Sequence, residues 1–394
     1  MQWLEKLLEV EMDVRITGLS KELNVLYLLS LFRKKKDNIL VVTNSLYECN
    51  QLFSLLSTYT DEVLLFPMDD FLSSVALAVS PDLKIKRLET LQKVSLGKHI
   101  VVTNLMGYLK YLPSLESKET QTFTLCVGDT FSRDELVERL EKFGYTRDSL
   151  VTATGNYAVR GFILDVFLTF LDHPIRIEFF GNSIESIRYF DENTQLSLQN
   201  ITEITFSPYE EFISEKHSSL LAYMQTPLVV FYDYQQIVAA NHKLEQDILE
   251  YKLANEIDKN EEYMYSFSSL SVSHALYIDT LENTEKSEIP CKKYRSQELE
   301  NFHSDFQLLK EKVGLWLQQK KTIVFCLSKE RQVLEIRELF PEAILCKNEV
   351  LAEQQVNIVL KKINKGFVFS SLVVLSEYDI EEVHEENTAQ LEAA

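Results

Sequence analysis

The sequence predicts a multidomain α/β protein, and three observations lead to that fold class. The chain has 394 residues, which exceeds the size at which a single hydrophobic core usually stops growing. Between Gly18 and Pro113, short apolar runs alternate with amphipathic stretches, a pattern typical of buried parallel strands joined by helices. From about Gln121 to Pro208 the pattern changes to strands with a single helix, which indicates a separate α+β domain.

The first α/β region contains three short apolar runs that we expect to be strands, at residues 38–43, 62–66 and 99–103. A helix is predicted to begin at Ser80-Pro81 and to end at Gly97. Its apolar residues recur at helical spacing and are expected to face the core, namely Ile85, Leu88, Leu91 and Val94.

The middle region is expected to contain a helix at 132–143, because Ser132 precedes Glu135 by three residues as in a capping box. A second α/β stretch follows this region. It is predicted to contain a buried strand at 228–233 and a long helix at 235–253.

A linker and a final α/β unit complete the predicted organisation. The linker is indicated by the Lys, Glu, Ser and Asn content of residues 282–300. The final unit is predicted from helices at 302–320 and 329–339 and strands at 322–326 and 371–375. The predicted divisions are a first α/β part at 1–118, an α+β domain at 119–208, a second α/β part at 209–285, a linker at 286–300, a small α/β domain at 301–380 and a frayed acidic tail at 381–394.

Charge and cysteine content exclude several classes of protein. The formal net charge of -20 disfavours nonspecific nucleic-acid binding, because phosphate contacts need a concentrated positive surface. The five cysteines form no C-x-x-C pair, which argues against a zinc site or a disulfide framework and indicates the cytoplasm. The longest apolar runs are shorter than the roughly 18 residues that span a bilayer. We therefore expect a cytoplasmic protein with no metal, no cofactor and no membrane segment.

A nucleotide-binding loop is predicted to have decayed near Gly18. Such a loop needs G-x-x-x-x-G-K-[ST], because glycine amides cradle the phosphates, the lysine neutralises their charge and the hydroxyl holds magnesium. Counting from Gly18, the second glycine, lysine and hydroxyl positions hold Leu23, Asn24 and Val25. Lys21 lies too early in the loop and is interpreted as a solvated residue at a helix start. We expect no nucleotide to bind here.

The acidic end of the strand at 228–233 leads to the same prediction. An ATPase of this kind would present Asp-Glu after its buried strand, to hold magnesium and activate water. Here Asp233 is followed by a tyrosine, so Asp233 is interpreted as a cap for the next helix.

Two ordered motifs stand in the middle region. Residues 155–167 read GNYAVRGFILDVF and residues 174–180 read PIRIEFF, and both have the β-branched and aromatic composition of strands. A two-residue hairpin signal, Gly181-Asn182, follows the second motif. The pair predicts adjacent strands that carry two arginines and an aromatic residue.

This motif pair resembles the UvrB-homology module of the bacterial transcription-repair coupling factors, and the similarity extends loosely from about Ile16 to about Glu377. Two residues depart from the family pattern. Phe162 stands where the family usually has a small or polar residue, and Leu168 stands where a proline commonly closes the strand. The resemblance implies a degenerate P-loop, RecA-like domain of UvrB type, an inserted strand-rich domain and then a small α/β domain.

UvrA is the partner that the resemblance implies, bound through residues 119–208 and in particular through Arg160, Arg176 and Phe180. Arg176 and Phe180 are separated by an even number of residues, so they should face the same side of one strand. Arginine and an exposed aromatic residue are typical of interface hot spots.

Structural roles remain open for these arginines. Arg176 could pair across the hairpin with Glu185 or with neighbours of Glu178, and Arg160 could brace the turn at Gly155. A carboxylate in an apolar strand needs a partner, and Asp165 is therefore predicted to bind an arginine.

One of the two neighbouring phenylalanines, Phe179 and Phe180, should pack inward, because a sheet needs one buried face. The residues that we expect in the core are Ile163, Leu164, Ile177 and Phe179.

UvrB also carries an aromatic-rich hairpin that grips DNA, and the corresponding stretch here is 67–86. It offers only Phe71 as an aromatic, so a platform for stacking nucleobases is missing. The basic residues at 33–36 and 361–365 are interpreted as solvated helix ends.

The resemblance therefore implies a non-catalytic module that recruits UvrA to stalled transcription. Members of this family continue into a domain that binds RNA polymerase and into a DNA translocase motor, and we expect this chain to be a fragment of such a protein. RNA polymerase and DNA would then be met only through domains of the parent. Two alternatives remain, a UvrB-like nucleotide-dependent damage loader and a free-standing regulator that competes with UvrB for UvrA.

Overall fold

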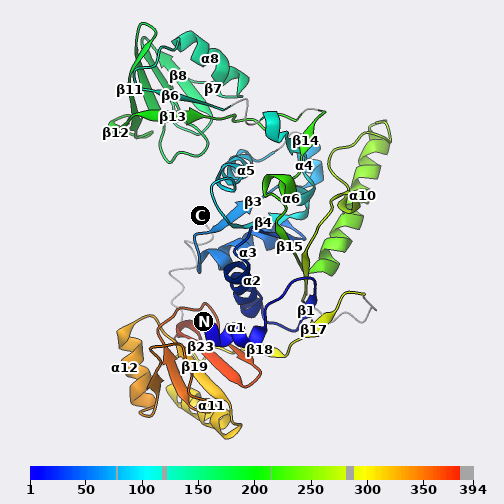
Figure 1. Ribbon diagram of the computed structural model, residues 1–394, viewed down its shortest axis with the longest axis vertical. Coiled ribbons are helices and arrows are strands. Elements are labelled where there is room, and N and C mark those ends of the chain that lie inside the picture. The colour runs from blue at the N-terminus through cyan, green and yellow to red at the C-terminus, as the bar shows by residue number, and fades with distance from the viewer. Residues whose placement is uncertain (77–78, 118–121, 214, 281–287, 382–394) are drawn as a thin grey trace.

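The computed structural model describes residues 1–394 apart from 77–78, 118–121, 214, 281–287 and 382–394. Three units follow one another along the long axis of Figure 1. We call residues 1–117 and 215–294 the N-terminal unit, residues 122–212 the inserted unit and residues 295–381 the C-terminal unit. Most of the predicted acidic tail lies outside the described residues. No helix in the described part of the chain is long and apolar enough to cross a membrane.

The N-terminal unit is built on a seven-stranded sheet in the order β17-β1-β16-β15-β2-β4-β3, and every pairing in it is parallel. The strands are β1 (Arg15–Thr17), β2 (Ile39–Thr43), β3 (Val63–Phe66), β4 (Ile100–Asn104), β15 (Leu228–Tyr232), β16 (Ala275–Asp279) and β17 (Cys291–Lys293). The chain leaves this sheet after β4 and returns to it with β15. The predicted parallel α/β fold with an inserted strand-rich domain is thus confirmed.

Helices cover both faces of this sheet, which explains why the central strands β2 and β4 are buried at every position and largely apolar. In β2, Ile39 and Val41 pack on one face, while Leu40 and Val42 pack on the other. The helices are α1 (Gln2–Leu8), α2 (Lys21–Lys35), α3 (Leu46–Ser57), α4 (Phe71–Val75), α5 (Pro81–Lys93), α6 (Leu105–Leu109), α9 (Leu220–Tyr223) and α10 (Tyr234–Ala254). A two-stranded ladder of β5 (Leu112–Pro113) and β14 (His217–Ser218) lies beside them.

The predicted helix after Ser80 is α5, which ends at Lys93 rather than near Gly97. Of the four predicted core residues, Leu91 and Val94 are buried, whereas Ile85 and Leu88 are only half-buried. The least exposed residue of this helix is Arg87, which pairs with Glu211 of the inserted unit.

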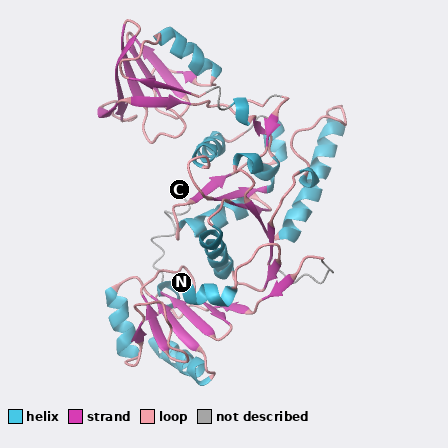
Figure 2. Cartoon of the chain, viewed as in Figure 1, coloured by secondary structure: helices cyan, strands magenta, loops and turns pink. Residues whose placement is uncertain are grey.

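The inserted unit is mostly strand, as Figure 2 shows. Its six-stranded sheet has the order β12-β11-β10-β9-β8-β7, and its neighbours are antiparallel except for β7 and β8. The elements are β6 (Phe123–Cys126), α8 (Arg133–Lys142), β7 (Thr146–Arg147), β8 (Asn156–Arg160), β9 (Ile163–Val166), β10 (Ile175–Phe180), β11 (Ser183–Phe190), β12 (Ser197–Ile201) and β13 (Glu203–Phe206). Helix α8 and the β6–β13 ladder share a hydrophobic core with one face of this sheet, which leaves the other face more open.

The C-terminal unit has a six-stranded mixed sheet in the order β18-β22-β23-β19-β21-β20. Its elements are β18 (Ser296–Glu298), α11 (Phe306–Gln318), β19 (Thr322–Cys326), α12 (Glu330–Leu339), β20 (Ile344–Leu345), β21 (Val356–Val359), β22 (Phe367–Phe369), β23 (Leu372–Ser376) and α13 (Glu377–Ile380). The four predicted elements of this unit are present with shifts of a few residues at their ends.

One hydrophobic cluster is shared by the N-terminal and C-terminal units, and each unit also has a cluster of its own. Side chains of α1 and α2 belong to the same cluster as Val324 and Cys326 of β19 and Val374 of β23. Helix α2 is buried without interruption from Glu22 to Phe32, as expected for a helix that is covered on all sides. In Figure 1 this helix and α1 lie between the two sheets.

The predicted linker at 286–300 needs a correction. Strand β17 lies at the edge of the seven-stranded sheet of the N-terminal unit, beside β1. Strand β18 lies at the edge of the sheet of the C-terminal unit, beside β22. Both are short edge strands that stay half-exposed, so their composition is polar and resembles that of a linker.

Candidate protein-interaction surface

Two neighbouring hairpins present the residues that the motif pair predicted. Strands β8 and β9 are joined by the turn Gly161-Phe162, and β10 and β11 by the turn Gly181-Asn182. Gly161 and Gly181 have φ of 62° and 60°, a left-handed conformation that tight hairpin turns require and that glycine adopts without strain. The predicted hairpin at Gly181-Asn182 is confirmed.

Asp165 joins the two arginines. Its side chain is 1% exposed and accepts a hydrogen bond from Arg160 Nη2 at 2.7 Å. It also accepts bonds from Arg176 Nε at 2.7 Å and Arg176 Nη2 at 2.9 Å, which is the bidentate geometry that arginine favours. The prediction that Asp165 pairs with an arginine is confirmed, and it pairs with both.

Arg176 is mostly covered. Its side chain is 12% exposed, and its guanidinium carbon lies 4.3 Å from the centroid of the Phe190 ring. Its Nη1 also donates to the carbonyl of Gln195 at 3.3 Å. The alternative partner for Arg176, Glu185, is therefore wrong, because the adjacent strand β9 places Asp165 directly opposite it.

Arg160 is the more accessible of the two arginines, with 46% of its side chain exposed. It does not brace the Gly155 turn, since its partner is Asp165. The ring of Tyr209 packs against Gly155 instead, 2.5 Å from where a Cβ would stand.

Phe180 is 77% exposed while Phe179 is 4% exposed. Buried and open positions alternate along β10, so Arg176, Glu178 and Phe180 share the open face, as predicted. The expected core residues Leu164, Ile177 and Phe179 are buried, and Ile163 is half-buried.

Two further residues of this surface were not singled out from the sequence as binding residues. Arg188 donates to Glu178 at 2.7 Å, and this hydrogen bond holds the pKa of Glu178 below its usual range. Phe162 is 70% exposed at a hairpin turn. Its departure from the family pattern was visible, but nothing local in the sequence indicated that its ring is exposed.

The segment in which we predicted a decayed nucleotide loop lies between β1 and α2, and other parts of the chain cover it. The Ser20 N–H donates to the hydroxyl of Ser296 at 2.8 Å, and that hydroxyl donates to the Gly18 carbonyl at 2.7 Å. A Cβ on Gly18 would stand 2.0 Å from the carbonyl oxygen of Tyr294. The residues at the predicted loop positions, Leu23, Asn24 and Val25, are buried in α2.

Asp233 occupies the N-cap position of α10, as interpreted, but its side chain makes no capping hydrogen bond. Its φ of 63° is left-handed, and burial raises the pKa of its carboxyl. Nearby, the Asp279 carboxylate lies 3.0 Å from Arg15 Nε, an ion pair that is not aligned as a hydrogen bond. Burial raises the pKa of Asp279 despite this charge.

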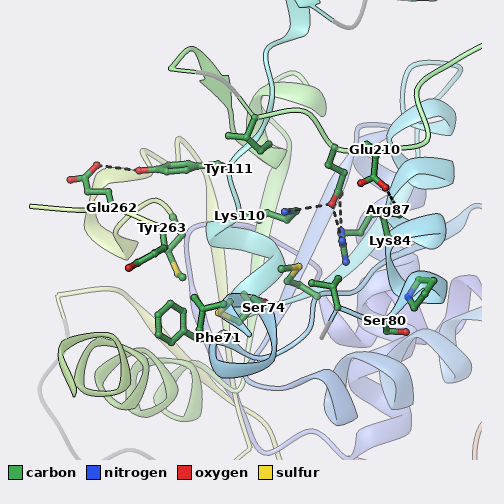
Figure 3. Close-up of a pocket in the computed structure, with 18 of the residues that line it drawn as sticks. Phe71, Ser74, Ser80, Lys84, Arg87, Lys110, Tyr111, Glu210, Glu262 and Tyr263 are labelled. Carbon is green, nitrogen blue, oxygen red and sulfur yellow. Dashed lines mark hydrogen bonds and ion pairs between the residues drawn. The ribbon is translucent and has the colours of Figure 1, made fainter. Parts of the chain in front are cut away.

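A cavity of about 560 Å³ lies where the inserted unit meets the N-terminal unit (Figure 3). Beside it, buried Arg87 donates through Nε and Nη2 to Glu211, both at 2.8 Å, and Lys110 Nζ lies 3.5 Å from the same carboxylate. Lys84 donates to Glu210 at 2.7 Å. Glu210 and Glu211 belong to the chain segment that leaves the inserted unit. Their carboxylates already pair with the cations that line this cavity.

Burial raises the pKa of Glu211, but the hydrogen bonds and charges of Arg87 and Lys110 outweigh it and hold that pKa below its usual range. Phe71, the aromatic residue noted in the 67–86 stretch, is 3% exposed and packs edge-on against Tyr251 and Tyr263. Its ring is therefore engaged in the core.

One group of three potential metal ligands occurs within the described residues, made of His173, Asp191 and Glu192. The sequence did not predict it, because these residues have no metal-binding spacing. Asp191 accepts hydrogen bonds from the N–H groups of Asn193 and Thr194, and His173 Nδ1 lies 3.1 Å from Glu192. These contacts are typical of a polar turn, and they explain why the three side chains lie close together.

Comparison with known proteins supports the resemblance. Residues 123–212 match the family described as the UvrB interaction domain. Over 201 residues, half of this chain, the sequence is 33% identical to a transcription-repair-coupling factor of Staphylococcus aureus (strain bovine RF122 / ET3-1). Over the same length it is 29% identical to one of Bacillus subtilis (strain 168). The aligned part covers 17% of each relative. The predicted similarity is confirmed, over a shorter span than the one expected.

Proposed function

We propose that this chain is the N-terminal region of a transcription-repair coupling factor, in which the inserted unit recruits UvrA to RNA polymerase stalled at DNA damage. One observation carries the proposal. The unit that matches the UvrB interaction domain presents Arg160 and Phe180 on its open sheet face, with Arg160 oriented by buried Asp165. An oriented arginine and an exposed aromatic residue on one surface are typical of interface hot spots.

In this role the chain itself acts only by recruiting UvrA, in the cytoplasm. The proposal assigns contacts with RNA polymerase and with DNA to parts of such a protein outside this sequence. Within the chain, UvrA is the expected partner, bound through the inserted unit.

The proposal assigns no catalysis to this chain. In support, the loop that would bind phosphates lacks the second glycine, the lysine and the hydroxyl of the motif. The Ser20 N–H at the start of α2 also donates its hydrogen bond to the hydroxyl of Ser296. A ligand that binds only the native state raises its stability in proportion to RT ln(1 + [L]/Kd). ATP with magnesium should therefore leave the melting temperature unchanged. A shift that saturates with ATP would favour the nucleotide-dependent damage loader instead.

Calorimetric titration of UvrA into the chain tests the recruitment proposal. Wild type should bind, and Arg160→Ala and Phe180→Ala should each lose about 2 kcal/mol or more of binding free energy. Arg331 offers a matched control, because it is an arginine of the C-terminal unit with 88% of its side chain exposed. Arg331→Ala should bind like wild type. A wild-type chain that does not bind UvrA contradicts the proposal.

A further inference from the structure

Two phenylalanines differ from the rest in their exposure. Phe162 is 70% exposed and Phe180 is 77% exposed, whereas the next most exposed phenylalanine among the described residues, Phe212, is 41% exposed. A single exposed apolar side chain needs no explanation, but two large ones at one place form an apolar patch.

Both residues lie at the same end of the inserted sheet. Phe162 is in the turn that joins β8 to β9, and Phe180 is the last paired residue of β10 before its own turn. Strands β9 and β10 are antiparallel neighbours, with Ile163 opposite Glu178, which brings the two turns side by side. The Phe179 N–H donates to the Phe162 carbonyl at 2.9 Å and joins the two hairpins there.

One segment holds both turns. The Phe131 N–H donates to the carbonyl of Asn182 at 2.7 Å, in the turn after Phe180. Two residues later, Arg133 donates through Nη1 to the carbonyl of Gly161, in the turn that carries Phe162. The start of α8 therefore fixes the backbone on which both rings are displayed. A surface that is ordered before binding loses less conformational entropy on binding.

We propose that Phe162 is a second aromatic anchor for UvrA, beside Phe180 and Arg160, and that it sets the partner preference of this chain. This inference rests on the proposed function. Each ring can bury roughly 150–250 Å² of surface, so the second ring adds substantially to the apolar contact. Because the Phe162 ring is large, apolar and 70% exposed, the UvrA that recognises this chain should have an apolar recess to receive it.

The experiment compares full-length variants of this chain in titrations with the UvrA encoded by the same genome. Phe162→Ser replaces the ring with a small polar side chain and should weaken binding at least about tenfold. Phe162→Leu keeps an apolar side chain and should retain most of the affinity. Leu198→Ala is the matched control, because Leu198 is 53% exposed on edge strand β12, away from both turns. It should bind like wild type. Melting temperatures of all variants should agree with wild type, since these side chains are exposed.

The possible results separate this inference from the function on which it rests. If wild type and Phe162→Ser bind equally while Phe180→Ala binds weakly, recruitment stands and the role of Phe162 is overturned. Equal losses in Phe162→Ser and Leu198→Ala would also overturn it, because the effect would not be specific to the hairpin turns. If the wild-type chain does not bind, the proposed function fails and this inference fails with it.

Discussion

Asp165 makes Arg160 and Arg176 parts of one assembly. Both arginines donate to its carboxylate, but they differ in exposure, with 46% of the Arg160 side chain and 12% of the Arg176 side chain open to solvent. Arg176 also packs on Phe190 and bonds to Gln195, whereas Arg160 faces outward. We infer that Arg160 contacts the partner and that Arg176 acts by holding Asp165 in place.

A double-mutant cycle tests this division of roles. Arg176→Ala should weaken UvrA binding by about 1–2 kcal/mol, yet it should cost almost nothing in a chain that already carries Arg160→Ala. The reason is that Arg176 would act only through the orientation of Arg160. Calorimetry measures the four affinities, and the ¹⁵Nε signal of Arg160 should shift in free Arg176→Ala. Additive losses, with no change in that signal, would assign Arg176 a direct contact.

The ion cluster at the junction leads to a stability prediction. Arg87 is 1% exposed and Glu211 is its bidentate partner, so Arg87→Ala removes both of these hydrogen bonds and leaves Lys110, 3.5 Å away, as the remaining cation beside the buried carboxylate. Arg87→Ala should lower the free energy of unfolding by about 3–5 kcal/mol in urea titrations. The control is Lys98→Ala, which removes the exposed pair with Asp37 and should cost at most about 1 kcal/mol. Similar losses in both variants would contradict a special role for the junction.

Among the elements, helix α2 departs most from the usual pattern of a surface helix. It is covered by the first sheet on one side and by the C-terminal unit on the other, so even Glu22 in its first turn is buried. Glu22 accepts hydrogen bonds from the Tyr59 hydroxyl and from the Asn364 N–H, which belongs to the C-terminal unit. Burial raises the pKa of Glu22, although these bonds oppose the shift.

This raised pKa predicts a pH dependence of stability. The folded protein holds the Glu22 proton to higher pH than the unfolded chain does, whose glutamates titrate near about 4.3. The free energy of unfolding should therefore decline as pH rises from that value through the folded pKa of Glu22. In Glu22→Gln this contribution should be absent, because glutamine accepts the same bonds without charge. Urea titrations of both proteins across pH measure the difference. Parallel pH profiles would contradict the prediction.

At the scale of the whole molecule, the shared core indicates two cooperative blocks rather than three. The N-terminal and C-terminal units bury one cluster between them in addition to a cluster of their own, while the main cluster of the inserted unit is shared with neither. The two tryptophans of the chain report only on the block formed by the N-terminal and C-terminal units, because Trp3 lies in α1 and Trp316 in α11.

Thermal unfolding should accordingly show one transition in tryptophan fluorescence and an additional one in calorimetry, from the inserted unit. Trp3→Phe and Trp316→Phe each leave one reporter, and both should give the same midpoint. Different midpoints would mean that the C-terminal unit unfolds independently of the N-terminal unit.

Local pattern was sufficient to predict much of this protein. Apolar runs predicted β2, β3, β4 and β15 of the first sheet, because strands covered on both faces are largely apolar, whereas β1, β16 and β17 were not predicted. The ordered motifs at 155–167 and 174–180 identified the hairpins, since turn glycines and strand alternation are local properties. The need of a buried carboxylate for a partner was enough to predict that Asp165 binds an arginine.

Only the tertiary structure decided which of the predicted site residues are accessible. Strand alternation shows that Phe179 and Phe180 face opposite ways, but the packing of α8 and of the β6–β13 ladder determines which face is buried. In the same way, the covering of Arg176 by Phe190 and Gln195 depends on residues distant in sequence. The sequence by itself therefore determined many of the helices and strands and the hairpins that carry the candidate residues. Exposure and the shared core depended on long-range packing, which no local pattern encodes.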